Sequence, residues 1–420
     1  MQILYLEPRY PGQYPHLIRH FARTTQVRQV FLQSAAHPIP AVTPGVQVRS
    51  YHAEEALPAS LGFGGELERA GRRAEAVRRA AQTLQAEGFR PDVVLAHGSF
   101  GEGLFIKDVF PDTRVIAFME YYYGVSGLIG SDPDFYPANP DAERRARLRN
   151  ALVWLTMEVA DAAVTPMHWQ HQLFPPDLRA RIQVIHDGID TTAIRPGPAA
   201  PLQVPSGAVL HPGQPIVTFC ARALEPVRGL HLVLRSLPEI LARHPAARIV
   251  LVGNPGHEYG APAPGGDWVT HLLDHLPTTL DRSRLIRAPF LPHADLIRLF
   301  QLSRAHIYAS LPFVLSWSIL EAMAAGAPVV AMATPPVLEA IRDGETGLTF
   351  PIGDTAALAR QVVSLLDSPA LGERLGQAGR AMVQQRYDLA QVCLPLHDQL
   401  IRGLALSRPL NADPIPRPWR

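Results

Sequence analysis

Short apolar runs alternate along the chain with longer stretches in which apolar residues recur every three or four positions. Runs of this kind predict buried strands, and they lie at residues 3–6, 27–32, 93–96, 115–119, 162–165 and 182–185, then at 216–220, 248–252, 285–288, 305–308 and 329–331. Helical patterns separate many of them, at residues 69–86, 230–243, 294–301, 317–325, 336–342 and 355–366. Strands that alternate with helices predict an α/β protein with doubly wound parallel sheets.

The length of the chain and the restart of the pattern predict two domains. The chain has 420 residues, more than the roughly 250 to 300 at which a single core stops growing. Residues 195–215 contain six prolines and three glycines, a composition typical of a linker. We expect domains over residues 1–200 and 201–395, and a C-terminal extension over 396–420 that is extended or loose from residue 408.

Composition favours an ordinary globular protein. Hydrophobic residues make up 47% of the chain, charged residues 18%, and the formal net charge is +1, so nothing points to nucleic-acid binding. The two cysteines, Cys220 and Cys393, form no CxxC pattern. This argues against a disulfide framework or a structural zinc site and favours a reducing cytoplasm.

The sequence pattern contains neither a signal peptide nor a membrane span. The first residues form a strand-like run without a basic region before it, and no run reaches the roughly 18 apolar residues of a span. The arginine-rich face of the helix at 69–86 could contact anionic lipid, although a solvated helix face is the commoner alternative. We expect a cytoplasmic protein that is at most peripheral at the inner membrane face.

Two arginines follow the first strand of the second series. Arg222 and Arg228 lie between the strand at 216–220 and the helix at 230–243. Guanidinium groups at the carboxyl end of a parallel strand can make charge-assisted hydrogen bonds to a diphosphate, and Gly229 allows close backbone approach. The alternative is a pair of solvated loop arginines.

A predicted helix N-terminus at residues 316–318 offers a second anion site. Its unpaired N–H groups and the positive end of its dipole suit a phosphate. Glu321, one turn further, could accept hydrogen bonds from ribose hydroxyls, or it could simply complement the helix dipole. Together with the two arginines, this N-terminus predicts a site for a nucleoside diphosphate whose leaving phosphate needs its charge stabilised.

Several segments of the sequence resemble those of a known protein family. The segments RALEPVRGLH, VLVGN, PHADLIRLFQLSRAHIY and LPFVLSWSILEAMAAGAPVVA resemble the C-terminal half of retaining GT-B glycosyltransferases of family 4. The segments HGSFGEGLFIKDVFP, EYYYG, TPMHWQ and VIHDGID resemble the N-terminal half of a bacterial branch of that family. The resemblance covers most of residues 1–395.

The resemblance implies roles for residues of the second half. Arg222 and Arg228 are expected on the donor diphosphate, although the spacing before Arg228 is one residue longer than usual, and Glu321 is expected on the ribose. The remaining expected contacts are backbone over the phosphates at Ser316, Trp317 and Ser318, and a nucleobase pocket at Gly253, Asn254 and Leu291. Phe313 departs from the family pattern, because it stands where the first glutamate of a pair should hold the donor sugar.

The first half is expected to supply the acceptor side. Gly12, with Gln13 beside it, matches the glycine loop that approaches the donor phosphates, or it is a simple turn. His97 and Glu102 follow the strand at 93–96 and Glu120 follows the strand at 115–119. Of these, His97 and Glu120 are expected to be catalytic residues. Glu120 stands where the family often has a sugar-contacting histidine, with a structural carboxylate as the alternative.

His186 and Asp187 end the last strand of the first series. They are expected to shape a turn more than to act chemically.

The fold implied by the resemblance is GT-B, two Rossmann-like domains facing across a cleft, with 1–200 on the acceptor side and 201–395 binding the donor. The implied activity is retaining transfer of a sugar from a nucleoside diphosphate sugar to a glycan, lipid-linked or other hydroxyl acceptor, in polysaccharide or glycoconjugate assembly. We expect no metal or other cofactor, since arginines replace a DxD-held metal, and no GxGxxG, P-loop, HExxH or GxSxG motif suggests other chemistry. A non-catalytic GT-B scaffold, suggested by Phe313, and a GT-B sugar-nucleotide epimerase remain alternatives.

Overall fold

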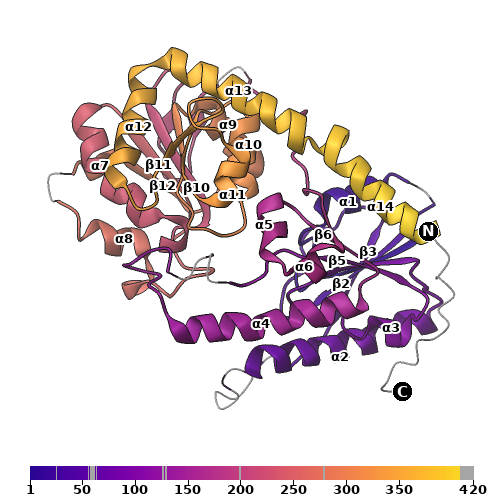
Figure 1. Ribbon diagram of the computed structural model, residues 1–420. Helices are drawn as coiled ribbons and strands as arrows, with labels where there is room; N and C mark the ends of the chain where they lie inside the picture. Colours follow the sequence, from indigo (N-terminus) through magenta and orange to yellow (C-terminus); the bar gives the residue numbers. More distant parts are fainter. Residues whose placement is uncertain are drawn as a thin grey trace. The chain divides into compact units, whose positions relative to one another are not determined.

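A computed structural model of the chain describes residues 1–24, 26–54, 56, 62, 64–124, 127, 130–197, 200–277 and 280–406. The chain forms two compact units (Figure 1). Unit 1 contains Met1–Gly124, Pro140–Gly188 and the C-terminal stretch from Leu389, and unit 2 contains Val125–Asn139 and Ile189–Asp388. The units therefore divide after residue 188 and not after residue 200, and residues 125–139 belong to unit 2. Residues 389–395, expected in the second domain, and 396–406, expected as an extension, belong to unit 1.

Unit 1 is built on a parallel sheet of seven strands in the order β3-β2-β1-β4-β5-β6-β7. The strands are β1 (Gln2–Leu6), β2 (Arg28–Ser34), β3 (Val46–Tyr51), β4 (Val93–His97), β5 (Arg114–Phe118), β6 (Ala162–Thr165) and β7 (Ile182–Val184). The strand order reverses between β1 and β4, and ligands of doubly wound sheets bind at the carboxyl ends of the strands beside such a switch point.

Both faces of this sheet are buried. Ile3 and Tyr5 of β1 pack in one cluster with Phe21 of helix α1, whereas Leu4 and Leu6 face the other side, as the alternation of side chains along a strand requires. The helices of unit 1 are α1 (Pro15–Ala22), α2 (Gly65–Ala86), α3 (Ile106–Val109), α4 (Pro140–Val159), α5 (His168–Leu173), α6 (Pro176–Arg179) and α14 (Leu394–Leu406), the last preceded by the π-helical turn η5 (Leu389–Cys393).

Unit 2 has the same architecture, with a parallel sheet of six strands in the order β12-β11-β10-β13-β14-β15. Its strands are β10 (Ile216–Ala223), β11 (Arg248–Asn254), β12 (Leu285–Ala288), β13 (Ala305–Tyr308), β14 (Val329–Met332) and β15 (Leu348–Phe350). The helices are α7 (Leu230–Arg243), α8 (Trp268–Leu273), α9 (His293–Leu302), α10 (Trp317–Ala324), α11 (Pro335–Ala340), α12 (Thr355–Asp367) and α13 (Pro369–Tyr387), with 3-10 turns η2 (Pro226–Arg228), η3 (Pro264–Gly266) and η4 (Arg282–Arg284). Here the switch point lies between β10 and β13.

The structure confirms the α/β class with two doubly wound sheets, and it adds elements that the pattern does not reveal. β3 is an edge strand with exposed residues between its ends, and β15 has only three residues, so neither forms an apolar run. In α13 the buried positions include Gly372, Gly376 and Gly379, because that helix packs closely; a side chain on Gly376 would lie 2.3 Å from the carbonyl oxygen of Gly326.

The proline-rich stretch at 195–215 is not only a linker. It contains the antiparallel pair β8 (Leu202–Gln203) and β9 (Val209–Leu210), and Leu202 and Leu210 are buried in the core of unit 2. At the other end of the chain, residues 396–406 of the predicted extension form most of α14, whose Ile401 is buried in the core of unit 1. The predicted loose tail from residue 408 lies outside the described residues.

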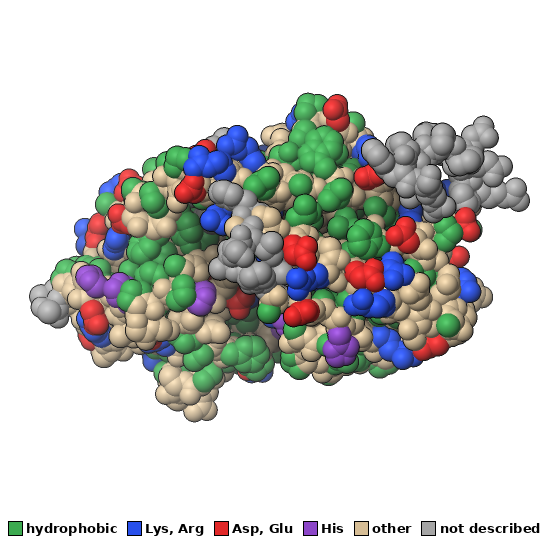
Figure 2. Space-filling model, turned by 90° about the horizontal axis from the view of Figure 1, so that it is seen from below, with side chains coloured by type: hydrophobic (Ala, Val, Ile, Leu, Met, Phe, Trp, Pro, Cys, Tyr) green, Lys and Arg blue, Asp and Glu red, His purple; other side chains and the backbone are tan. Residues whose placement is uncertain are grey.

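The arginine-rich face of α2 is balanced by glutamates of the same helix. Arg72 pairs with Glu68 at 2.9 Å and Arg78 pairs with Glu75 at 2.7 Å. Figure 2, which views the side of unit 1 that carries α2, shows acidic and basic side chains interspersed there, as on a solvated helix face. In the part of the chain that the structure describes, no helix combines the length and apolar composition needed to cross a bilayer.

Candidate active site

The predicted donor residues gather at the carboxyl edge of the sheet of unit 2. Four adjacent strands contribute to this edge in the order β12-β11-β10-β13. Their ends carry Leu291, Asn254, Arg222 and the loop that leads to Ser316. The regular alternation of strands and helices therefore brings together residues that are distant in the sequence, such as Arg222 and Ser316, which are 94 positions apart.

Arg222 and Arg228 are the cationic groups of this edge. Arg222 is exposed and belongs to the last residues of β10, where the pairing with β11 shifts after Cys220, and not to the following loop. Arg228 is half-buried at the end of η2, and its guanidinium lies 4.9 Å from the centre of the Tyr259 ring. Among the described residues neither guanidinium has a carboxylate partner. Both charges are thus available to an anion.

Gly229 and Gly253 have structural reasons to lack a side chain. Gly229 has φ +77°, and a Cβ there would lie 2.0 Å from the carbonyl oxygen of Ala309. At Gly253 a Cβ would lie 2.3 Å from the carbonyl oxygen of Ala221. The close backbone approach expected at Gly229 is therefore an approach to the end of β13, and Gly253 allows the ends of β10 and β11 to pack.

Helix α10 begins where the sequence predicts, and its first amides have partners. Ser316 is the N-cap, and its Oγ accepts the N–H of Ser318 at 3.3 Å. The N–H of Ser316 itself donates to the Tyr308 hydroxyl at 3.0 Å. Capping by serine is the usual way to satisfy these donors, so a phosphate near Ser316, Trp317 and Ser318 would compete with these internal hydrogen bonds.

Glu321 is paired with a histidine. Its Oε1 lies 2.8 Å from Nε2 of His293, and the side chains are 14% and 62% exposed respectively. Burial and the nearby Glu321 carboxylate raise the pKa of the Cys220 thiol to about 12, which places Glu321 beside the end of β10. A ribose hydroxyl at Glu321 would therefore meet the imidazole of His293 as well.

The nucleobase candidates differ in exposure. Asn254 is exposed, its Oδ1 accepts the N–H of Gly256 at 2.9 Å, and its carbonyl accepts the N–H of Leu224 at 2.8 Å. Leu291 is 6% exposed and packs in a core cluster of unit 2. Asn254 thus shapes the turn after β11, and Leu291 offers little surface to a ligand.

An aromatic and acidic cluster surrounds the position of the missing glutamate. The ring of Phe313 lies 5.6 Å from that of Tyr259, which in turn supports Arg228. The carboxylate of Glu225 is fully buried and accepts the N–H groups of Glu258, Tyr259 and Gly260 at 3.2, 3.2 and 2.9 Å. No motif in the sequence predicts a role for Glu225, and the extra residue between Arg222 and Arg228 is the only local signal that this loop differs.

In unit 1, His97 and Glu120 form a pair at the carboxyl ends of β4 and β5. His97 Nε2 lies 3.5 Å from Oε2 of Glu120, and the two side chains are 1% and 23% exposed. The Nδ1 atom accepts the N–H of Ser99 at 3.2 Å, so the Nε2–H of the neutral ring points to Glu120. Burial alone would lower the pKa of His97, but Glu120, Glu7 and Glu102 together raise it above its ordinary value.

Glu7 is a site residue that the sequence analysis misses. It follows β1, is 8% exposed, and its Oε2 accepts the N–H of Gln13 at 2.8 Å, while Gln13 Nε2 donates to Glu120 Oε1 at 3.5 Å. A Cβ on Gly12, where φ is +55°, would lie 1.8 Å from the Glu7 carboxylate. Gly12 therefore makes room for Glu7. Burial raises the pKa of Glu7 to about 7.

Glu102 lies behind this group. It is fully buried, its Oε1 accepts the Tyr51 hydroxyl at 2.8 Å, and its Oε2 has no hydrogen-bond partner among the described residues. Burial raises the pKa of Glu102. Together Glu7, Glu102, Glu120 and His97 surround the switch point between β1 and β4, an arrangement able to accept hydrogen bonds from hydroxyl groups.

His186 and Asp187 lie beyond β7. Burial, with smaller effects of His397 and His16, lowers the pKa of His186 to about 3. Its Nδ1 accepts the N–H of Gly188 at 3.0 Å, in keeping with a neutral ring that shapes the turn.

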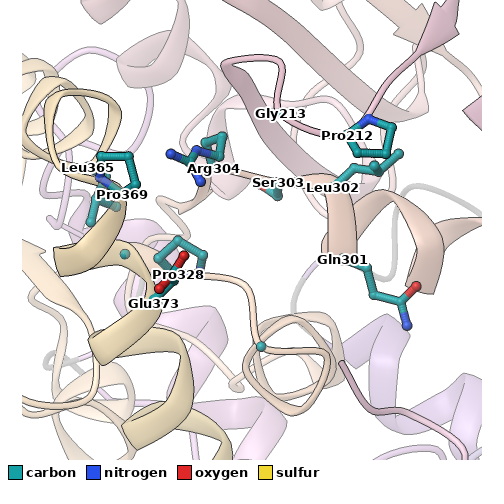
Figure 3. A pocket seen from close by; sticks show the side chains of 12 residues that line it. Pro212, Gly213, Gln301, Leu302, Ser303, Arg304, Pro328, Leu365, Pro369 and Glu373 are labelled. Carbon is teal, nitrogen blue, oxygen red and sulfur yellow. The ribbon is translucent and has the colours of Figure 1, made fainter. Parts of the chain in front are cut away.

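A separate cavity of about 250 Å³ opens at the other edge of the unit 2 sheet (Figure 3). Pro212, Arg304 and Pro328, which line it, precede β10, β13 and β14. It lies at the amino ends of the strands and does not coincide with the predicted donor residues. Within the described ranges, His, Cys, Asp and Glu side chains form no group of three or more that could hold a metal ion.

Two family models match consecutive parts of the chain. The model described as "Glycosyl transferase family 4 group" matches residues 25–194, and the model described as "Glycosyl transferases group 1" matches residues 206–382. The matched stretches contain strands β2 to β7 and β9 to β15.

Curated proteins match mainly through part of their length. The D-inositol 3-phosphate glycosyltransferase of Nocardia farcinica is 34% identical over 203 residues, which are 47% of this chain and 42% of that protein. Spore coat protein SA of Bacillus subtilis is 26% identical over 231 residues, 52% of this chain and 58% of that protein. The chain spans about half the length of the curated relatives it matches.

Solved structures match over almost the whole chain. HepE from Anabaena, in complex with UDP and glucose, has a TM-score of 0.66 and 17% identity, covering 95% of this chain and 99% of that one. Sucrose-phosphate synthase from Thermosynechococcus elongatus has a TM-score of 0.71 and 17% identity, covering 97% and 100%. At this identity the likeness shows a shared fold.

Proposed function

The chain belongs to the family 4 glycosyltransferases and has their two-domain GT-B fold, and from this premise we propose that it transfers a sugar from a nucleoside diphosphate sugar to a hydroxyl group of an acceptor. The transfer retains the anomeric configuration and needs no metal ion. The observation that carries the proposal is the pair of guanidinium groups, Arg222 and Arg228, without carboxylate partners among the described residues at the switch-point edge of unit 2.

The arginines act on the leaving group. As the bond from the sugar C1 to the phosphate oxygen breaks, negative charge develops on the diphosphate, and two fixed guanidinium groups stabilise that charge more than the ground state. The bond from C1 to the acceptor oxygen forms on the same face, and the acceptor proton passes to the departing phosphate oxygen. The positive end of α10 adds to this field near Ser316, Trp317 and Ser318.

The other predicted contacts follow from the same placement. Glu321 accepts from the ribose, Gly253 and Asn254 border the base, and Leu291, which is 6% exposed, supports this pocket from the core without offering it much surface. Gly12 shapes the loop that holds Glu7. On the acceptor side, Glu120 is the more exposed member of its pair with His97, with 23% of its side chain exposed against 1%. Its carboxylate orients the attacking hydroxyl or a sugar hydroxyl, with the Nε2–H of His97 fixing it.

The acceptor is a glycan or lipid-linked molecule, and the reaction belongs to polysaccharide or glycoconjugate assembly. HepE is described in complex with UDP and glucose, so a uridine diphosphate sugar is the first donor to try. Peripheral membrane contact gains little support from α2, whose arginines are paired with glutamates.

Phe313 supports a second candidate function, that of a non-catalytic subunit. An apolar ring at this place, packed against Tyr259, cannot accept a hydrogen bond from a sugar hydroxyl, which favours a non-catalytic subunit that binds nucleotide.

Release of nucleoside diphosphate from a panel of donor sugars, with and without acceptor, separates the two functions. Turnover that Arg222→Ala lowers by about a hundredfold or more supports the transferase. Turnover that is unchanged in this variant contradicts the site assignment, and tight nucleotide binding without any turnover supports the subunit.

A further inference from the structure

A short turn from the first half of the sequence is part of unit 2. The chain leaves unit 1 after Gly124 and returns to it at Pro140. Residues 130–136, here named the docked turn, are closed by hydrogen bonds from the N–H of Gly130 to the Tyr136 carbonyl at 2.9 Å and from the N–H of Tyr136 to the Asp132 carbonyl at 3.0 Å. The Oδ1 atom of Asp132 also accepts the N–H groups of Asp134 and Phe135, each at 2.9 Å.

A buried pair fixes the docked turn to helix α7. Asp132 Oδ2 lies 2.8 Å from Nε2 of His231, and the side chains are 7% and 0% exposed. The Phe135 ring lies 4.7 Å from the His231 ring and 5.5 Å from the Trp268 ring. Removing one partner of such a pair leaves a buried polar group unsatisfied. The turn is therefore held to the same helix whose preceding residues include Arg228.

The last residue of the docked turn lies beside the donor arginine. A Cβ on Gly260 would lie 2.5 Å from the Tyr136 hydroxyl and 3.1 Å from Glu225 Oε2. Burial, and then the carboxylates of Glu225 and Asp132, raise the pKa of Tyr136 to about 12, with Arg228 acting in the opposite direction. The hydroxyl is thus near Glu225, which binds the N–H of Tyr259, and the ring of Tyr259 lies 4.9 Å from the Arg228 guanidinium.

The Tyr136 hydroxyl has hydrogen-bonding capacity to spare. The residue is half-buried, and among the described residues its hydroxyl makes no hydrogen bond. Glu225 already accepts three backbone N–H groups from residues 258–260. A protonated hydroxyl beside an unpaired guanidinium suits the oxygen of an anion that the guanidinium attracts.

We propose that Tyr136 is a donor-binding residue whose hydroxyl donates a hydrogen bond to a diphosphate oxygen held by Arg228, and that Asp132 and His231 position it. The inference rests on the proposed function, since it assumes that Arg228 binds the donor diphosphate. The donor site is then built from two parts of the chain, because the docked turn comes before the boundary expected from the sequence and Arg228 after it.

The test is nucleotide binding to the full-length protein by calorimetry, with UDP as the probe, followed by GDP and ADP. Tyr136→Phe removes only the hydroxyl and is expected to weaken diphosphate binding by about ten- to a hundredfold, with no effect on the parent nucleoside. Arg228→Ala is expected to weaken the same binding. Arg235→Gln, which breaks only the exposed pair of Arg235 with Asp134, is the matched control and should bind as the wild type does.

Positioning by Asp132 is tested in a double-mutant cycle. Asp132→Asn should weaken diphosphate binding in the wild-type background and add no further loss in the Tyr136→Phe background. Additive losses would assign Asp132 a structural role only. Circular dichroism and unchanged unfolding midpoints check that Tyr136→Phe is folded.

The outcomes distinguish the role of Tyr136 from the proposed function. If Arg228→Ala weakens UDP binding and Tyr136→Phe does not, the proposed function stands and the role of Tyr136 is wrong. If the wild type binds no nucleoside diphosphate, both are wrong.

Discussion

Replacing Glu7 by glutamine should change how stability depends on pH. Folding raises the pKa of Glu7 from 4.5 to about 7, mainly because the carboxyl is buried. The native state therefore binds the proton more tightly than the unfolded state does. The stability that this bound proton contributes is fully present below about pH 4.5 and is lost as the pH rises through about 7.

The size of the effect follows from the two pKa values. At about 1.4 kcal/mol for each tenfold change in proton affinity, a rise from 4.5 to about 7 corresponds to about 3 kcal/mol between pH 4 and pH 8. Glutamine cannot ionise, and its side-chain oxygen can still accept the N–H of Gln13. Glu7→Gln should thus gain about 3 kcal/mol over the wild type as the pH is raised.

Urea unfolding at a series of pH values from 4 to 8 measures this difference. Glu54→Gln is the control, because it removes a carboxylate that is 83% exposed and lies 3.7 Å from Arg72, and the change specific to Glu7→Gln is measured against it. If Glu7→Gln runs parallel to this control, Glu7 is not held in the neutral form and the reasoning about its burial is refuted.

Three further predictions concern groups whose surroundings are equally defined. Gly229→Ala should lower the free energy of unfolding by more than about 2 kcal/mol in urea, because its Cβ would lie 2.0 Å from the Ala309 carbonyl oxygen; an unchanged midpoint would contradict this contact. Burial alone would raise the pKa of Asp161, but its ion pairs with Lys107 and Arg114 hold that pKa below its ordinary value. Asp161→Asn should therefore be less stable than the wild type at pH 7 in thermal unfolding, with a gap that narrows toward pH 3, and a constant gap would count against it. The Cys220 thiol, with its pKa raised to about 12 by burial and Glu321, should react with iodoacetamide at pH 8 about a thousandfold more slowly in the native protein than after unfolding, and equal rates would disprove the shift.

The sequence predicts the regular parts of the molecule because their signals are local. Helix α7 spans residues 230–243, as its apolar spacing predicts, and the strands from β10 to β14 fall on the predicted apolar runs. Parallel strands end at one edge of their sheet, so the carboxyl-edge placement of Arg222 and Glu120 follows from strand assignment alone.

The residues that sequence analysis misses depend on partners far along the chain. Asp132 and His231 are 99 positions apart, and Glu225 binds backbone amides about 33 to 35 positions later. A contact made by backbone amides, such as that of residues 258–260 with Glu225, cannot be recognised from the identities of the residues that provide them. The pKa of Glu7 likewise depends on the loop over Gly12 and on the charges of His97 and Glu120, which follow β4 and β5, and no local pattern contains these contacts.

The two sheets place chemically different groups, guanidiniums in one and carboxyls in the other, at equivalent positions. At the switch point of unit 2 lie the guanidiniums of Arg222 and Arg228, which have no carboxylate partner among the described residues, and at the switch point of unit 1 the carboxyl groups of Glu7, Glu102 and Glu120 lie around the imidazole of His97. The proposed sugar transfer makes matching demands, because the departing diphosphate gains negative charge and the attacking hydroxyl gives up a proton. One topology used twice therefore supplies both kinds of field, and the difference lies only in the few side chains that follow its central strands.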